Sequence, residues 1–140
     1  MKKFVAGLLS GVLIAGISCH TSQIEDIDKK NEEIRLSIGK AQGTTREDLQ
    51  KVLQVVNCET TYGGGCEWIL GDFDVREGGE ARCGGIAKTI ALEAATYGFD
   101  SEILLEFRGL KAHYYAILKR DSQEFEIRGT PPDLHFKEIR

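Results

Sequence analysis

The sequence has no surplus of positive charge. Its 140 residues include 18 Lys and Arg against 22 Asp and Glu, which gives a formal net charge of −4. A nucleic-acid-binding protein needs a basic surface to neutralise phosphates, so this composition argues against DNA or RNA as a partner. The chain also lacks a phosphate-binding loop and a dinucleotide-binding glycine motif. It contains no internal repeat and no low-complexity segment, so we expect one small domain.

The spacing that marks a metal site is also missing. Four cysteines and three histidines are present, but no two cysteines are separated by two to four residues and no two histidines by three to five. Such close pairs are typical of zinc sites, so we expect neither a metal nor another cofactor. His20 and His135 are expected to lie in solvent.

Long apolar runs are limited to one, at the N-terminus. The uncharged stretch from Phe4 to Ile17 follows Lys2 and Lys3 and precedes small residues. It is short for a membrane-spanning helix, which needs roughly 20 residues. A positive start, an apolar middle and a small-residue exit predict an export signal over residues 1–18. A buried N-terminal helix is the alternative.

The stretch Gly16-Ile17-Ser18-Cys19 resembles a bacterial lipobox. This resemblance implies that Cys19 is lipidated, becomes the mature N-terminus and anchors the protein to a bacterial membrane in the cell envelope. Simple secretion and a retained anchor are the alternatives. The mature chain would carry 16 basic and 22 acidic residues, so electrostatic docking on anionic lipid is not expected.

Three cysteines remain in the exported part. Cys58 and Cys66 enclose a glycine-rich loop that would close as a disulfide, and such a bond is stable outside the cytoplasm. Cys83 is then left as a thiol. A bridge between Cys66 and Cys83 is the alternative, and it would remove that thiol.

Periodicity divides the chain into a tether and a domain. Residues 19–43 are predicted to be a tether that becomes an amphipathic helix over 24–38, where isoleucines recur with helical spacing. The domain is predicted over residues 44–140. It opens with a capping box, because Glu47 stands three residues after Thr44, followed by a helix that ends near residue 57.

The rest of the domain is predicted to contain a loop, a helix and three strands. The loop covers residues 58–82, and its Trp68 either borders a substrate groove or, more simply, packs. A helix follows over 83–97, capped by Gly98. Strands are expected at residues 102–107, 113–120 and 123–128, the last two joined by the Asp121-Ser122 turn. Thr130-Pro131-Pro132 is expected to end the sheet.

The chemistry is expected at the start of this helix and of the strand that opens at residue 113. Cys83 at a helix N-terminus faces free backbone N–H groups and the positive end of the helix dipole, both of which favour the nucleophilic thiolate. His113, thirty residues later, would take and return its proton. The alternatives are a small buried cysteine and a structural histidine.

The segment CGGIAKTIALEAATYGFDSEILLEFRGLKAHYYAILKRDSQEFEIRGTPPD, residues 83–133, resembles the transglutaminase-like branch of the papain-like cysteine hydrolases. The resemblance implies an α+β fold with a small papain-like core, in which the catalytic helix packs on an antiparallel sheet. It also implies that Cys83 is the nucleophile and His113 the general base and acid. Gly84 and Gly85 would leave the first helical turn open to a substrate carbonyl, while backbone N–H groups stabilise the oxyanion.

The third catalytic position departs from the family pattern. The family places an Asp on the strand after the hairpin, where this chain has Arg128, which cannot accept a hydrogen bond from imidazole. A two-residue turn predicts that Ile117 faces Glu126, Tyr115 faces Arg128 and His113 faces Thr130. Glu126 or Asp133 would then orient the imidazole, or a Cys–His dyad would act without a third residue.

Two functions follow from these patterns. The first is a lipid-anchored cysteine peptidase, amidase or acyltransferase that acts on a peptide or protein substrate through Cys83 and His113. The second is a non-catalytic envelope lipoprotein that uses the same fold as a binding module. The Arg at position 128 favours the second.

Overall fold

The computed structural model describes residues 11–38, 43–63, 72–109 and 111–140. The described chain forms helices and strands in the order α1 (Gly11–Ile38), α2 (Thr45–Glu59), β1 (Thr61–Tyr62), β2 (Glu80–Ala81), α3 (Cys83–Ala95), β3 (Asp100–Arg108), β4 (Lys111–Arg120), β5 (Gln123–Arg128) and β6 (His135–Glu138).

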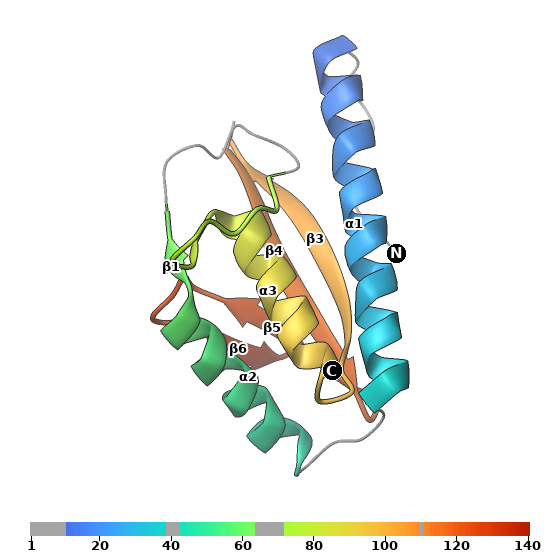
Figure 1. Cartoon of the computed structure of the whole chain (residues 1–140), viewed down its shortest axis with the longest axis vertical. Helices are drawn as coiled ribbons and strands as arrows, with labels where there is room; N and C mark the ends of the chain where they lie inside the picture. The colour runs from blue at the N-terminus through green and yellow to red at the C-terminus, as the bar shows by residue number, and fades with distance from the viewer. Residues whose placement is uncertain (1–10, 39–42, 64–71, 110) are drawn as a thin grey trace.

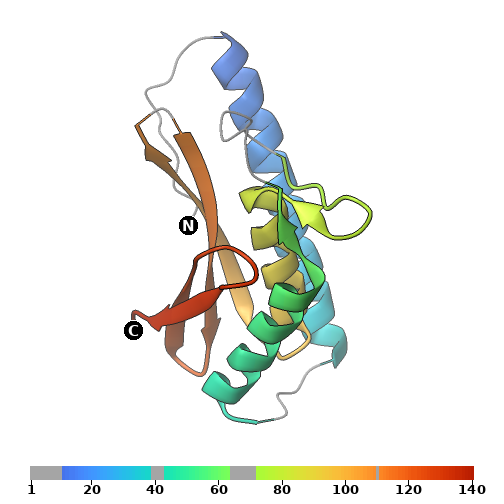
Figure 2. The same ribbon diagram turned by 90° about the vertical axis from the view of Figure 1, so that its left-hand side faces the viewer.

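The molecule has two layers, a sheet and a layer of helices. Strands β3, β4, β5 and β6 form an antiparallel sheet in that order. Helix α3 lies on one face of this sheet, with α1 on one side of it and α2 on the other (Figures 1 and 2). This architecture confirms the α+β class that the sequence predicts.

The core lies between the sheet and α3. Along β4, the alternate residues Ala112, Tyr114, Ala116 and Leu118 are buried and pack towards the helices. The facing side of α3 is rich in buried alanine, at positions 87, 91, 94 and 95. Short side chains let α1, α2 and the sheet all approach α3 closely, so the helix that begins at Cys83 is held from three sides.

Both ends of α3 are set by local backbone geometry. At the C-terminal end, Gly98 has a φ of 82° and the Phe99 N–H donates to Ala94 O at 3.1 Å, so the helix ends with the glycine cap that the sequence predicts. At the N-terminal end, a Cβ on Gly84 would lie 2.3 Å from Asp72 O. The backbone of the segment before β2 therefore packs directly on the first turn of α3.

Helix α2 begins with the predicted capping box. The Glu47 N–H donates to the Thr44 hydroxyl at 3.1 Å, and the Thr44 N–H donates to the Glu47 carboxylate at 3.2 Å. The helix runs two residues beyond its predicted end. Just after it, β1 pairs in parallel with β2.

A buried ion pair joins α2 to the far end of the sheet. Asp48 is fully buried, and Arg120 donates to it at 2.8 Å and to Tyr97 O at the same distance. The guanidinium also lies 4.7 Å from the centre of the Phe99 ring. Burial alone would raise the pKa of Asp48, but the Arg120 hydrogen bond and charge and the Gly43 N–H together hold that pKa below its usual value.

Helix α1 is longer than predicted and is part of the packed domain. Ile24 and Ile27 are buried in the same cluster as the start of α3. The Asn31 side-chain amide, 1% exposed, donates to Ala91 O at 2.9 Å and to Phe99 O at 3.2 Å. The packed domain therefore begins at Ile24 rather than at residue 44, and the predicted export boundary after residue 18 falls within α1.

The C-terminal tail adds a strand that the sequence analysis missed. The predicted turn is present, with φ of 53° at Asp121 and 66° at Ser122. The prediction that Thr130-Pro131-Pro132 ends the sheet is wrong, because β6 pairs with β5 after that turn. Phe136 of β6 packs edge-on against the buried Phe125 ring, with 5.5 Å between the ring centres. This apolar contact holds the tail against the sheet.

Candidate functional site

The site lies where β4 and β5 separate. The paired residues of these two strands run from Arg120↔Gln123 to Ile117↔Glu126, and the second pair confirms the predicted register. The predicted continuation, with Tyr115 opposite Arg128 and His113 opposite Thr130, is wrong because it is not part of the ladder that the structure describes. In its place the start of α3 approaches β4, and the Tyr114 N–H donates to Cys83 Sγ at 3.4 Å.

Cys83 occupies this position because the first turn of α3 is clamped. Arg82 has extended backbone just before the helix and forms an ion pair with Asp72 at 3.2 Å. The N–H groups of a first helical turn have no partner within the helix, and they create a positive potential beside the half-buried Cys83 thiol. The sulfur is therefore in a setting that favours the thiolate.

His113 reaches the same place from the other side of β4. Strand alternation puts it on the sheet face opposite the buried Tyr114. It shares that face with Tyr115, and the two rings stack with centres 6.3 Å apart and an interplanar angle of 11°.

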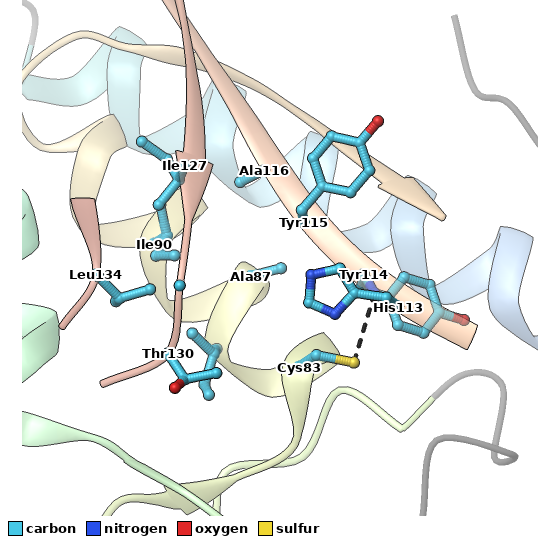
Figure 3. Close-up of a pocket in the computed structure, with 12 residues that line it drawn as sticks. Cys83, Ala87, Ile90, His113, Tyr114, Tyr115, Ala116, Ile127, Thr130 and Leu134 are labelled. Atoms are coloured by element: carbon cyan, nitrogen blue, oxygen red, sulfur yellow. Dashed lines mark hydrogen bonds between the residues drawn. The ribbon is translucent and has the colours of Figure 1, made fainter. Parts of the chain in front are cut away.

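Cys83 and His113 line one pocket, together with Ala87 of α3, Tyr115 of β4 and Thr130 after β5 (Figure 3). In Figure 3 the imidazole lies beside the sulfur, between it and Tyr115. The cavity volume is about 20 Å³. A cavity of roughly 10–15 Å³ holds one water molecule, so this space is large enough for one water.

No family model, curated protein or solved structure matches the chain.

The two carboxylates predicted to orient the imidazole have other surroundings. Glu126 forms an ion pair with Arg128, with 2.7 Å between Oε2 and Nε. Asp133 is exposed on the turn before β6, and its backbone carbonyl lies 3.0 Å from His135 Nδ1. His135 is exposed, as expected.

A third carboxylate was missed by the sequence analysis. Glu106 of β3 is the register partner of His113, and residues paired across an antiparallel ladder project on the same face with Cβ atoms about 5 Å apart. The signal was present in the sequence, because a short turn around Gly109 fixes the pairing of β3 with β4. The sequence pattern placed in register only the β4–β5 hairpin, which does not contain Glu106.

Negative charge gathers beside the pocket. The pKa of Tyr115 is raised, first by burial and then by the charges of Glu106, Glu126 and Glu102. These carboxylates therefore lie within electrostatic reach of the Tyr115 hydroxyl, on the sheet face that also carries His113. Tyr115 stays protonated and neutral at physiological pH.

The two glycines after Cys83 have a packing role. Both are buried, and a Cβ on Gly85 would lie 2.4 Å from Asp74 O and 2.9 Å from the Ala81 side chain. Gly84 is equally confined by Asp72 O. Close backbone packing alone thus requires glycine at both positions, whatever they contribute to substrate access.

The other predicted site residues are a disulfide pair, a tryptophan and the lipidation site. Cys66 and Trp68 lie outside the described residues, so the proposed disulfide stays a prediction, and Cys58 is exposed at the end of α2. Cys19 lies within α1. In the described part of the chain, no three His, Cys, Asp or Glu residues gather closely enough to hold a metal ion. No described helix is long and apolar enough to cross a membrane.

Proposed function

We propose that the protein is a lipid-anchored cysteine hydrolase of the cell envelope, with a transglutaminase-like fold, which cleaves amide or peptide bonds. The observation that supports this proposal is the shared pocket of Cys83 and His113 at the N-terminus of α3. The start of α3 supplies the thiol and unpaired backbone N–H groups, and β4 supplies the imidazole, which are the groups that a cysteine hydrolase uses.

The chemistry follows from this arrangement. The Cys83 sulfur attacks the substrate carbonyl carbon, and the N–H groups of the first turn of α3 stabilise the oxyanion. His113 gives its proton to the nitrogen as the C–N bond breaks, which releases an amine and leaves a thioester on Cys83. Water, deprotonated by His113, then attacks the thioester, releases the acid and restores the thiol. An amine in place of water would give acyl transfer.

A binding module is the second candidate, and it has one observation in its favour. Arg128 occupies the position of the family acid and holds Glu126 in an ion pair. A guanidinium cannot accept a hydrogen bond from imidazole, so Arg128 cannot act as the third catalytic residue. In this alternative the pocket would retain its shape and lose its chemistry.

Iodoacetamide alkylation across pH 5 to 9 separates the two candidates. In a Cys66→Ser variant, in which the predicted disulfide cannot form, the exposed Cys58 thiol serves as an internal control, and each site is followed by peptide mass spectrometry. For an enzyme we expect Cys83 to react faster than Cys58 below pH 8, and His113→Ala to abolish that advantage. His135→Ala is the matched control, because His135 is exposed and does not line the pocket.

An ordinary thiol titration at Cys83 that is unchanged by His113→Ala would overturn the enzymatic proposal. It would favour the binding module.

A further inference from the structure

Helices α1 and α3 run in the same direction, side by side (Figures 1 and 2). Successive residues of α1 contact successive residues of α3 in the same order. Ile24 shares a cluster with Ala87, and Asn31 donates to Ala91 O. Further along, Arg35 lies 3.5 Å from Asp100, beyond the end of α3. The start of α1 therefore lies at the same end of the molecule as the start of α3.

This register fixes the level of Cys19 relative to the pocket. Cys83 precedes Ala91 by eight positions, and Gln23 precedes Asn31 by eight, so Gln23 lies near the level of Cys83. Cys19 is four residues earlier in the same helix. At a rise of about 1.5 Å per residue, its backbone lies about 6 Å beyond that level, one helical turn from the pocket.

The connection between Cys19 and the domain is short and helical. Ile24 is 1% exposed and Asn31 equally so, and the Asn31 amide bonds to two backbone carbonyls of the core. A buried side chain with two hydrogen bonds resists both sliding and rotation of α1. An anchor at Cys19 would therefore restrict the orientation of the domain as well as its distance from the membrane.

We propose that a lipid on Cys19 holds the pocket end of the domain against the bilayer, so that the partner of this surface is the lipid headgroup region. The inference rests on the lipidation in the proposed function. Cys83 and the β3–β4 hairpin then face the membrane, and the hairpin of Asp121 and Ser122 points away, at the other end of β4. The substrate of such a site is an amide held at the membrane surface.

Chemical coupling tests the orientation without relying on natural lipidation. A chain that begins at Cys19 retains every core residue that the structure describes, because the first of them is Ile24. With the other three cysteines changed to serine and Trp68→Phe, Cys19 is coupled to a maleimide lipid in phosphatidylcholine vesicles. Single tryptophans, Lys111→Trp at the pocket end and Gln123→Trp at the far end, report contact through quenching by brominated lipid.

We expect quenching of the Lys111→Trp emission and none of the Gln123→Trp emission. A flexible Gly-Ser linker inserted between Cys19 and Ile24 should reduce the difference between the two positions, because it uncouples the anchor from α1. Equal quenching without the linker, or stronger quenching at position 123, would overturn the orientation. Circular dichroism of each variant confirms that it is folded.

The two proposals fail separately. Mass spectrometry of the native chain from membranes tests whether Cys19 carries lipid, and the alkylation experiment tests the chemistry of Cys83. A native chain without lipid on Cys19 would overturn the membrane partner in the cell, whatever the vesicles show. If His113→Ala does not change the alkylation rate of Cys83, the enzymatic proposal fails and the proposed orientation at the membrane is unaffected.

Discussion

At the residue scale, Cys83 at the start of α3 and His113 in β4 line one pocket, and local sequence features surround each of them. Two glycines follow the cysteine at the start of an alanine-rich helix, and aromatic and aliphatic residues follow the histidine in a strand. Glu106 has no comparable local sequence feature, because its position opposite His113 depends on the register between β3 and β4. The point at which β4 and β5 stop pairing could not be predicted either, since it depends on tertiary packing.

Glu106→Gln tests whether this carboxylate positions His113. A carboxylate beside imidazole favours imidazolium, which in turn favours the Cys83 thiolate, so its removal should slow Cys83 alkylation at pH 6 by roughly threefold to tenfold. The measurement is the alkylation rate of Cys83 across pH 5 to 9. Glu102→Gln, four residues away on the same strand face, is the control. An unchanged pH profile in Glu106→Gln would leave the dyad without a third member.

Gly84→Ala tests the clamp on the first turn of α3. A Cβ there would lie 2.3 Å from Asp72 O and 3.1 Å from the Phe73 ring, so either the backbone or the helix must move. We expect the free energy of unfolding to fall by about 3 kcal/mol in urea denaturation. Lys88→Ala, on the half-exposed side of the same helix, should change it by less than about 0.5 kcal/mol.

At the element scale, the helices were predicted better than the last strand. The capping box and Gly98 mark the start of α2 and the end of α3 through backbone chemistry that neighbouring residues determine. Strand β6 has only four residues, and its pairing with β5 depends on a turn of six residues. The contact of Phe136 with Phe125 that brings it back is a tertiary contact, which periodicity alone does not reveal.

Thr44→Ala tests the start of α2. The substitution removes the acceptor for the Glu47 N–H, and loss of such a cap destabilises a protein by about 1 kcal/mol. Thermal and urea denaturation measure the change. Glu47→Gln is the matched control, because glutamine keeps the acceptor for the Thr44 N–H and completes the capping box as well as glutamate does. Equal destabilisation by both variants would contradict the role of the Thr44 hydroxyl.

At the scale of the whole molecule, the α+β class was predictable and the place of α1 was not. The isoleucines at 24, 27, 34 and 38 indicate an amphipathic helix, but an apolar stripe does not say which surface it covers. In the structure, the hydrogen bonds from the Asn31 amide to Ala91 O and Phe99 O fix the position of α1 against α3. A polar residue inside an apolar stripe was the available signal that the stripe docks at a fixed place.

The Asp48–Arg120 pair makes global stability depend on pH. The folded-state pKa of Asp48 lies below its unfolded value, so its contribution is complete at neutral pH and is lost as the pH falls through the unfolded and then the folded pKa, below about 4. Asp48→Asn leaves the buried Arg120 guanidinium with only the exposed Asp121 carboxylate as an ionic partner, at 3.3 Å, and we expect a loss of about 3 kcal/mol at pH 7. The acid-induced loss in urea denaturation should also be smaller in this variant.

Glu80→Gln is the control for that pair. Glu80 forms an ion pair with Arg76, and both side chains are more than half exposed, so its loss should cost less than about 0.5 kcal/mol. A comparable effect of the two substitutions at pH 7 would show that burial is not what gives the Asp48 pair its importance.

The bond from the Tyr114 N–H to Cys83 Sγ ties the covalent state of the sulfur to the protection of a backbone amide. Any electrophile that converts the thiol to a thioether or a thioester weakens the sulfur as an acceptor and leaves that amide open to solvent. Deuterium uptake at Tyr114 should therefore accelerate once Cys83 is modified. The deuterium uptake of the Tyr114 amide would then report the fraction of molecules in which Cys83 is modified, without a chromogenic substrate.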